Sequence, residues 1–177
     1  MRRGHQERLA PLVAEAFGRT GIRPSDLGHI GVTLGPGSFT GVRAGLAFAK
    51  GLAAGLGLRL TGMGTLEALN HHPALLGRSV LGAIHGGRDH LYGQVGDGPP
   101  RALVPGHMPA ADVLTGPAAQ LVRDHYPHAD IFVQDWPALS VLAALTLMPG
   151  HDDVTPLYMR EADAVISTRG IITLTSA

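Results

Sequence analysis

Apolar residues in the segment 5–20 recur with the period of an α-helix. Five of them stand at positions i, i+3, i+4, i+7 and i+8: Leu9, Leu12, Val13, Ala16 and Phe17. This spacing places them on one helix face. Gly21 follows, and glycine is common just after the end of a helix. The pattern therefore predicts an amphipathic helix over residues 5–20.

Short apolar runs bounded by glycine, proline or polar residues predict strands. They cover residues 29–35, 59–63, 79–85, 90–95 and 131–133, and a further strand is expected at 171–174. Helices are expected at residues 39–55, 65–71, 117–125 and 138–147. Thr65 is predicted to cap the helix 65–71, with Glu67 in its first turn. The turn at residues 86–89 predicts a hairpin between its two flanking strands.

The alternation of strands and helices is typical of an α/β protein with a mostly parallel sheet. A chain of 177 residues has the length of one domain or two small lobes. The boundary is expected near residues 72–77, where a helix ends and the hairpin begins. Because the chain opens with a helix, the first strand of a parallel sheet would come from elsewhere or be missing.

Composition and charge exclude several classes of function. Fourteen Lys and Arg balance fourteen Asp and Glu, which argues against a nucleic-acid binder that works by bulk charge. The chain has no cysteine, so a disulfide framework, a cysteine zinc site and a thiol nucleophile are excluded. It has neither an apolar signal core nor a run long enough to span a bilayer. We therefore expect a cytoplasmic protein that makes no membrane contact.

The segment between the strand 29–35 and the helix 39–55 carries the most information. It contains Gly35, Pro36, Gly37, Ser38, Phe39, Thr40, Gly41, Val42 and Arg43. A loop between a strand and a helix N-terminus can hold an anion on its backbone amides. Its spacing fits neither a Walker A loop, nor GxGxxG, nor a nucleophile elbow. The alternative is a tight turn in which Ser38 caps the helix, and the pattern leaves both open.

The helix after this loop is unusually rich in small residues. Gly41, Gly45 and Ala49 recur at four-residue spacing on one face. A glycine inside a helix costs about 1 kcal/mol relative to alanine, so close packing or function should offset that cost. The helix either packs tightly on its own sheet or approaches a helix of another chain, and the pattern does not separate these. Arg43 and Lys50 share a side of this helix and are either solvated or paired with a partner's carboxylates.

Ten histidines raise the question of a metal site. None of them forms a His-x-x-x-His pair, and Pro127 between His125 and His128 argues against a shared helix face. No Ser-His-Asp set is apparent either. We therefore predict no metal ligand, no catalytic residue and no cofactor.

Four residues are expected to have structural roles. His85 and His90 flank the hairpin turn and should be exposed. Trp136 is predicted to pack in the core or between lobes and not to stack on a base. Tyr158 is predicted to help the C-terminal segment pack back across the lobes.

Residues 32–58, VTLGPGSFTGVRAGLAFAKGLAAGLGL, resemble the signature of the TsaB (YeaZ) family. Other segments agree. Residues 4–11, GHQERLAP, are similar to the family's GHSERLLP, and residues 64–69, GTLEAL, to its STLEAL. Residues 80–84 and 88–92 resemble its hairpin, and residues 156–160, PLYMR, its closing PLYLR. The resemblance spans about residues 4–163.

The resemblance implies a fold of the actin/Hsp70/sugar-kinase superfamily with two ribonuclease-H-like lobes. It implies the non-catalytic subunit of the machinery that makes threonylcarbamoyladenosine at position 37 of tRNAs reading ANN codons. TsaC supplies threonylcarbamoyl-adenylate, TsaD transfers the group to adenosine N6, and the ATPase TsaE joins the TsaB–TsaD pair. The chain would be a cytoplasmic scaffold that activates TsaD and touches tRNA only indirectly.

The resemblance also implies an interface. Family members dimerise, or pair with TsaD, through their first two helices, here residues 5–20 and 39–55. The interface residues would be Leu9, Leu12, Val13, Ala16, Gly41, Gly45, Phe48, Ala49 and Leu52. The signature loop would comprise Gly35, Pro36, Gly37, Ser38, Phe39, Thr40, Gly41 and Arg43.

The sequence departs from the family in two places. The family begins with a strand carrying Asp-Thr-Ser and further strands, which this chain lacks, so exposed edges and an uncovered sheet face are expected. Residues 85–87, His-Gly-Gly, replace the family's Asp-Ala-Arg. We expect residues 1–74 to be the remnant of a first lobe, 75–165 a second lobe and 166–177 a tail. The alternatives are a small nucleotide-dependent phosphotransferase of the superfamily and a truncated inactive fragment.

Overall fold

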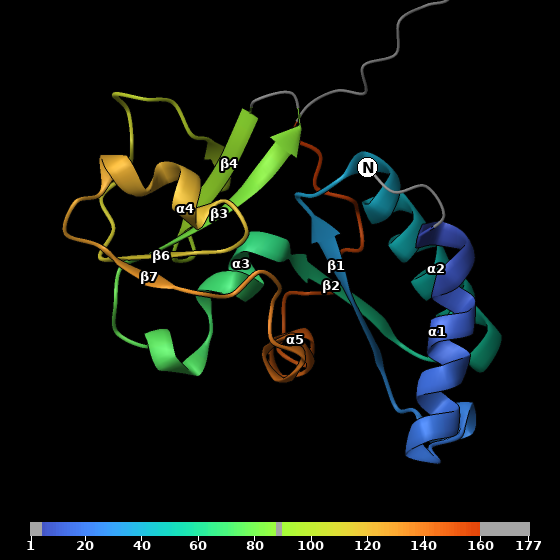
Figure 1. The fold of residues 1–177 in the computed structure, drawn as a ribbon. Helices are drawn as coiled ribbons and strands as arrows, with labels where there is room; N and C mark the ends of the chain where they lie inside the picture. The colour runs from blue at the N-terminus through green and yellow to red at the C-terminus, as the bar shows by residue number, and fades with distance from the viewer. Residues whose placement is uncertain (1–4, 88–89, 160–177) are drawn as a thin grey trace, which may run out of the picture.

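The computed structural model describes residues 5–87 and 90–159. Two β-sheets organise this part of the chain (Figure 1). The first sheet pairs β1 (Ile30–Gly35) with β2 (Leu60–Gly64) in parallel. The strand predicted at 171–174 and Arg160 of the PLYMR segment lie outside the described residues.

The second sheet has five strands in the order β5-β4-β3-β6-β7. They are β3 (Val80–Gly87), β4 (His90–Val95), β5 (Arg101–Ala102), β6 (Val113–Thr115) and β7 (Asp130–Phe132). β3 and β4 form the predicted antiparallel hairpin, β5 continues it, and β6 and β7 run parallel to β3. The α/β class is confirmed. Sequence patterns missed β5, which has two residues, and β6, which has three.

Helices cover both faces of the first sheet. α1 (His5–Thr20) and α2 (Phe39–Leu56) lie on one side, and α5 (Leu139–Thr146) lies on the other (Figure 1). The α5 contact is tight, because a Cβ atom on Gly31 would meet the Thr146 hydroxyl at 2.6 Å. The Thr61 hydroxyl donates to the Thr146 carbonyl at 2.8 Å.

The expectation of an uncovered sheet face is therefore wrong. α5 follows the second sheet in sequence but packs against the first sheet, and no local sequence pattern predicts this packing. Residues 139–146, which fall in the range expected for a second lobe, thus pack against the first sheet.

α3 (Thr65–Asn70) connects the two sheets. Its buried Leu66 and Leu69 pack against Ile84 and Tyr92 of the β3–β4 hairpin. The predicted cap at Thr65 is wrong, because Thr65 is the first residue of the helix and Gly64 is its N-cap. The Glu67 carboxylate accepts the Gly64 amide hydrogen at 3.2 Å, and so satisfies a donor that the helix leaves free.

The main core lies beside the second sheet. Its buried residues are Leu81, Ala83, Leu114, Ala118, Ala119, Val122, Tyr126 and Ala129. The helix predicted at 117–125 is here a short α4 (Ala119–Val122) followed by a 3-10 turn, Arg123–His125. Two more 3-10 turns, Pro24–Asp26 and Pro73–Leu75, precede β1 and β3.

Two predictions about aromatic and imidazole side chains can be compared with the structure. His85 and His90 are exposed, as predicted. The prediction for Trp136 is wrong, because 80% of this residue is exposed. Trp136 lies in the connection between β7 and α5, where none of the elements in residues 5–87 and 90–159 covers it. Among the described helices, none combines the length and apolar character needed to cross a membrane.

Candidate partner-binding surface and signature loop

The signature loop begins with a backbone that requires glycine. Gly35 has φ +102°, and a Cβ atom there would lie 2.9 Å from the Leu157 carbonyl oxygen. L-residues rarely adopt this φ, so glycine permits both the turn and the close approach of the C-terminal segment. Gly35 and Pro36 are buried, whereas Gly37, Ser38 and Thr40 are exposed.

Ser38 caps α2, which is one of the two interpretations that the sequence left open. Its Oγ accepts the Gly41 amide hydrogen at 3.2 Å, and its carbonyl accepts that of Val42 at 2.9 Å. A Cβ atom on residue 41 would lie 2.5 Å from Ser38 Oγ. Glycine at position 41 therefore leaves room for the capping hydroxyl, and the turn-and-cap interpretation of the loop is confirmed.

Phe39 stands at the centre of an aromatic and cationic stack at the start of α2. The Phe39 and Tyr158 rings have centroids 5.1 Å apart and are tilted by 40°. The Arg43 guanidinium lies 5.0 Å from the Phe39 ring centroid, within cation–π range. These contacts join the signature loop to the C-terminal end of the described chain.

Residues 151–159 pack back along the first sheet. The Gly62 amide of β2 donates to the His151 carbonyl at 2.8 Å, and the Leu157 amide donates to the Leu34 carbonyl of β1 at 2.8 Å. Met159 then packs against the cluster that joins α3 to the hairpin.

Charged contacts hold the first part of this segment. Arg59 forms an ion pair with Asp152. Hydrogen bonds from Thr155, with a smaller contribution from the nearby Lys50 charge, hold the pKa of Asp153 below its ordinary value. The segment therefore contacts β2 and α2 through both backbone and side chains.

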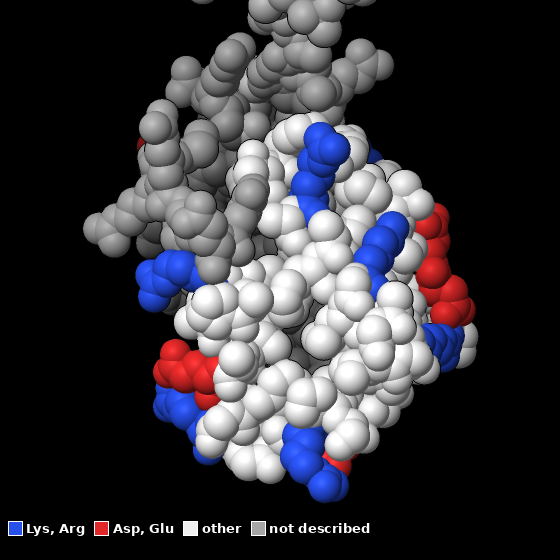
Figure 2. Space-filling view, turned by 90° about the vertical axis from the view of Figure 1, so that its right-hand side faces the viewer, with Lys and Arg blue, Asp and Glu red and all other residues white. Residues whose placement is uncertain are grey.

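The predicted interface residues lie on two helices that pack side by side. Leu12 and Ala16 of α1 and Gly41 of α2 are exposed. Five further members are half-buried: Leu9, Val13, Gly45, Phe48 and Leu52. Ala49 is buried within the chain. Figure 2 views the side of α1 and α2 and shows uncharged residues interspersed with several Lys or Arg side chains, with acidic side chains at its margins.

Gly45 differs from the glycines that the fold itself requires. It lies inside α2, and no heavy atom would come within 4 Å of a Cβ atom placed on it. The packing of the described chain therefore does not demand glycine there. Gly62 is the opposite case, because a Cβ atom on it would meet the Leu34 side chain at 2.5 Å.

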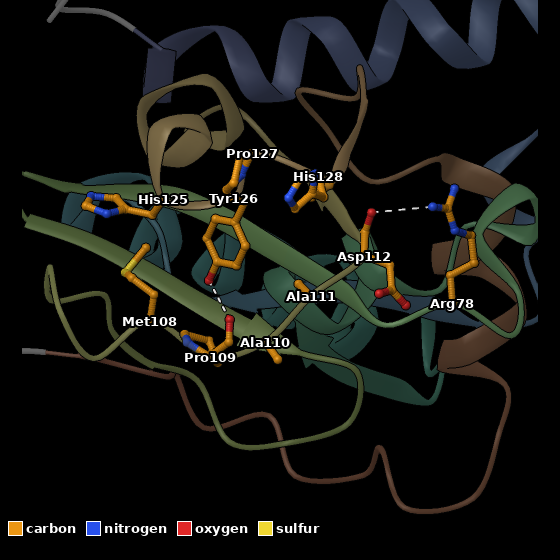
Figure 3. A pocket seen from close by; sticks show the side chains of 11 residues that line it. Arg78, Met108, Pro109, Ala110, Ala111, Asp112, His125, Tyr126, Pro127 and His128 are labelled. Carbon is orange, nitrogen blue, oxygen red and sulfur yellow. Dashed lines mark hydrogen bonds between the residues drawn. The ribbon is translucent and has the colours of Figure 1, made fainter.

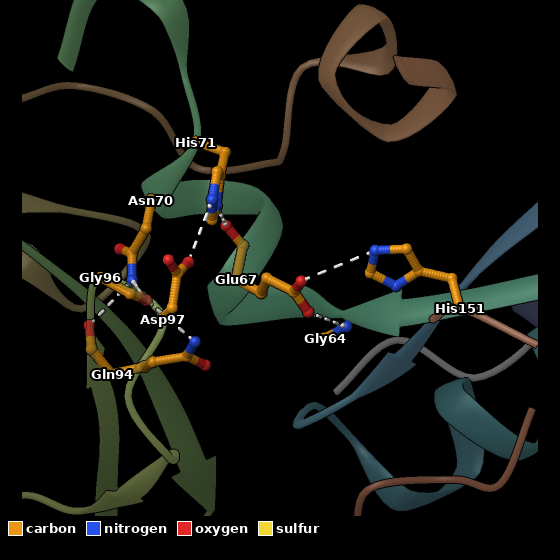
Figure 4. A network of polar contacts seen from close by, with 8 residues as sticks. All are labelled: Gly64, Glu67, Asn70, His71, Gln94, Gly96, Asp97 and His151. Atoms are coloured by element: carbon orange, nitrogen blue, oxygen red, sulfur yellow. Dashed lines mark hydrogen bonds and ion pairs between the residues drawn. The ribbon is translucent and has the colours of Figure 1, made fainter. Parts of the chain in front are cut away.

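A polar network surrounds α3 where the two sheets meet (Figure 4). His71 contacts the Asp97 carboxylate through Nε2 at 3.1 Å and the Glu67 carbonyl through Nδ1 at 2.8 Å. His151 Nε2 lies 4.0 Å from the Glu67 carboxylate. Asn70 donates to two carbonyls at the end of β4. These contacts hold α3 between the C-terminal segment and β4.

A pocket of about 600 Å³ opens beside the second sheet (Figure 3). Its polar side chains contact the protein itself: Tyr126 donates to the Pro109 carbonyl at 2.6 Å, and Arg78 pairs with Asp130 at 2.7 Å. Burial raises the pKa of Tyr126. His125 and His128 line the pocket. Within residues 5–87 and 90–159, no three metal-binding side chains gather into a metal site.

Comparison with known proteins connects this structure to tRNA modification. A family model described as TsaD, tRNA N6-adenosine threonylcarbamoyltransferase, matches residues 1–112. The tRNA threonylcarbamoyladenosine biosynthesis protein TsaB of Bacillus subtilis strain 168 is 31% identical over 176 residues, covering 97% of this chain and 66% of that protein. The chain belongs to the TsaB (YeaZ) family.

Two other relatives match this TsaB-family chain over shorter segments. TsaB of Escherichia coli K12 is 41% identical over 67 residues, which are 38% of the chain and 29% of that protein. The threonylcarbamoyltransferase of Paracoccus denitrificans is 52% identical over 64 residues, which are 36% of the chain and 18% of that protein. The matched part of the chain thus spans less than a third of these two relatives.

Solved structures share the fold of this TsaB-family chain. A Pseudomonas aeruginosa protein described as similar to peptidase YeaZ superposes with a TM-score of 0.72 at 24% identity, over 89% of this chain and 85% of that one. YeaZ from P. aeruginosa superposes with a TM-score of 0.64 at 24% identity, over 80% and 76%. The α/β architecture is therefore that of YeaZ structures.

Proposed function

We propose that this chain is a non-catalytic scaffold subunit in the synthesis of threonylcarbamoyladenosine on tRNA in the cytoplasm. It activates a TsaD-type transferase by binding it through α1 and α2. The alignment with B. subtilis TsaB over 97% of the chain carries this proposal. A TsaE-type ATPase joins the pair, tRNA touches this subunit only indirectly, and a homodimer through the same helices would compete with TsaD.

The surface of α1 and α2 supports this role. The predicted interface residues on the two helices are all uncharged, which suits a protein interface, because charged residues are depleted from interface cores. Gly45 supports close approach by another helix, since the chain's own packing leaves open space around it. In the proposal, the signature loop sets the position of α2 through the Ser38 cap and the Phe39–Tyr158 stack.

The residue content supports a scaffold over an enzyme. The chain has no cysteine and no His-x-x-x-His pair, and that pair is the metal-binding motif that the family resemblance assigns to the catalytic paralogue. In the proposal, TsaD holds the metal and the residues that carry out threonylcarbamoyl transfer. This chain binds TsaD and takes no part in the chemical step.

We also propose that the two sheets correspond to the lobes of the actin/Hsp70/sugar-kinase superfamily. In the second sheet, an antiparallel β3-β4-β5 meander is extended by the parallel strands β6 and β7, the order of a ribonuclease-H-like sheet. The proposed division places residues 1–74 in the first lobe, 75–165 in the second and 166–177 in a tail, with α5 returning to the first.

The test is complex formation with the TsaD protein of the same organism, measured by size exclusion with light scattering. We expect a one-to-one pair of subunits for the wild type and its loss for Gly45→Leu, because leucine fills the space left for a partner. Gln120→Leu places the same side chain at an exposed position on α4, outside the predicted interface, and should still bind. Binding by Gly45→Leu, with both variants folded, would overturn the assignment to α2.

A second measurement tests the scaffold role itself. Purified TsaD is assayed for threonylcarbamoyl transfer to tRNA with and without this chain, in the presence of TsaC and TsaE. We expect transfer to require TsaD and to rise when this chain is added. Transfer by this chain without TsaD would contradict the non-catalytic role, and binding without any rise would contradict activation.

A further inference from the structure

His71, the C-cap residue of α3, contacts an oxygen atom through each of its two ring nitrogens (Figure 4). Nδ1 lies 2.8 Å from the Glu67 carbonyl oxygen, and Nε2 lies 3.1 Å from the Asp97 carboxylate. Glu67 belongs to the same helix, whereas Asp97 lies in the turn at residues 96–98, between β4 and β5. The imidazole ring therefore connects the end of α3 to the second sheet.

The two oxygen atoms determine the protonation state in which both contacts are hydrogen bonds. A carbonyl oxygen only accepts, so Nδ1 must carry a hydrogen atom to bond to Glu67. An ionised carboxylate also only accepts, so Nε2 must carry a hydrogen atom to bond to Asp97. A neutral imidazole has one ring hydrogen, and an imidazolium has two. His71 can therefore donate to both partners only as the cation.

The end of α3 is a favourable place for that cation. The last carbonyl groups of a helix lack intrahelical partners and carry partial negative charge, and histidine side chains often bond to them. The neighbouring His72 is engaged elsewhere, because its Nδ1 accepts the Ala74 amide hydrogen and its ring packs against Phe132. The Glu67 carboxylate faces the Gly64 amide and, at 4.0 Å, His151.

The elements that pack on α3 place few other titratable groups near this ring. α5, β1 and β2 contain no titratable side chain. β3 and β4 contain His85, His90 and Tyr92. The two histidines lie at the opposite end of the hairpin from Asp97, and Tyr92 packs in the apolar cluster against α3. Among the described residues, Asp97 is thus the acidic side chain that contacts the His71 ring.

The residue before His71 holds the same part of the second sheet without titrating. Asn70 donates to the carbonyls of Gln94 and Gly96 through its amide group. This attachment does not change with pH, since an amide group gains and loses no proton in the neutral range. The His71–Asp97 contact adds to it one residue further along the turn. Its loss would therefore loosen the turn and leave α3 attached.

We infer that His71 is a proton-dependent clamp between α3 and the turn at residues 96–98. As the cation it donates to Asp97 and holds the turn. Histidines titrate between about pH 5 and 8, and solvent reaches both partners, whose side chains are 34% and 85% exposed. Nδ1 keeps its hydrogen for the Glu67 carbonyl, so Nε2 gives up its proton as the pH rises. The contact with Asp97 therefore adds stability at the acidic end of this range and is lost at the alkaline end.

The position of the departing proton can be measured directly. The full-length chain, labelled with nitrogen-15, is titrated from pH 5 to 8.5, and the two ring nitrogens of His71 are followed by NMR. We expect both to carry hydrogen at the acidic end and Nδ1 alone to carry it at the alkaline end. A neutral ring with its hydrogen on Nε2 would mean that the Glu67 carbonyl is not its partner, and would overturn the inference.

A double-mutant cycle with His71→Gln and Asp97→Asn measures the clamp itself. In urea unfolding at pH 6 the coupling should change the folding equilibrium constant roughly two- to five-fold, the range of exposed ion pairs. At pH 8.5 the coupling should be absent. Coupling that is equal at the two pH values, or absent at pH 6, would overturn the inference, because a merely structural contact does not depend on protonation.

The exposed ion pair of Arg23 and Asp26 is the matched control. Its guanidinium and carboxylate lie 2.7 Å apart, and arginine keeps its charge over this whole range. A cycle with Arg23→Gln and Asp26→Asn should therefore give the same coupling at pH 6 and pH 8.5. The inference goes beyond the proposed function, since all of these measurements use the chain alone and none depends on TsaD.

Discussion

The side-chain oxygen of Asn70 lies over Gly82, 2.7 Å from the position that a Cβ atom on residue 82 would take. The amide group of the same asparagine donates to the carbonyls of Gln94 at 3.0 Å and Gly96 at 3.1 Å. Gln94 is also the residue paired with Gly82 across the hairpin. The missing side chain at position 82 therefore lets α3 attach to the end of β4.

We expect Gly82→Ala to destabilise the fold by about 1–3 kcal/mol, the usual cost of overpacking a core. The added methyl group would push Asn70 away from the two carbonyls that it satisfies. Urea unfolding measures the effect. Gly28→Ala is the control, because a Cβ atom on Gly28 meets nothing within 4 Å. Equal stability of the two variants would contradict the proposed packing.

Elements with local chemical signals could be predicted from the sequence. The cap of α2 by Ser38 was one of two interpretations that the sequence offered, because a cap depends only on residues within one turn. The β3–β4 hairpin was predicted from two apolar runs and the turn between them. The helical period of residues 5–20 likewise predicted α1, with identical ends.

Features decided by distant parts of the chain could not be predicted. Burial of Trp136 was expected, but its side chain stays exposed among the residues that the structure describes. Nothing near Gly31 indicates that Thr146 of α5 will lie against it. The partner of Phe39 in its stack, Tyr158, lies at the other end of the described chain. Local patterns predict elements, whereas packing between sheets sets these contacts.

Ser38→Ala should cost about 1 kcal/mol of stability, the typical effect of removing an N-cap side chain. The Gly41 amide would lose the hydroxyl that accepts its hydrogen. Ser38→Asp is the control, because aspartate also caps helices and its charge favours a helix N-terminus. Thermal unfolding should rank the aspartate variant near the wild type and the alanine variant below both. An alanine variant as stable as the wild type would show that the cap contributes nothing.

Gly45→Ala should change stability and association in opposite directions. Alanine removes the helix penalty of glycine, and open space receives its methyl group, so unfolding free energy should rise by about 0.5–1 kcal/mol. The same methyl group would hold back a closely packed partner helix, so binding to TsaD should weaken. Urea unfolding and a titration of TsaD test the two effects. Tighter or unchanged binding would show that Gly45 lies outside the interface.

The stack of Phe39 and Tyr158 should contribute about 0.5–1.5 kcal/mol beyond burial, as aromatic pairs do. A double-mutant cycle of Phe39→Leu and Tyr158→Leu measures this coupling in urea unfolding. The single variants should also expose the C-terminal segment to limited proteolysis after residue 150. A coupling energy near zero would mean that the two rings touch without holding the segment against α2.

The buried phenol of Tyr126 should make the stability of the fold depend on pH. Tyr126→Phe tests this, because it removes the phenol. Tyr126 is only 7% exposed, and its hydroxyl donates to the Pro109 carbonyl at 2.6 Å. Loss of this bond should cost about 1 kcal/mol near neutral pH.

Burial raises the pKa of Tyr126 in the folded state, so the folded protein holds the phenolic proton more tightly than the unfolded chain does. The resulting stability is complete below the unfolded pKa of about 10 and is lost as the pH rises through the folded value. The wild type should therefore lose its advantage over Tyr126→Phe above about pH 10. Tyr158→Phe, which changes an exposed tyrosine, is the control and should be as stable as the wild type near neutral pH. Urea unfolding of the three proteins from neutral to alkaline pH provides the comparison, and a gap between wild type and Tyr126→Phe that stays constant over this range would show that the Tyr126 phenol is not protected from ionisation in the fold.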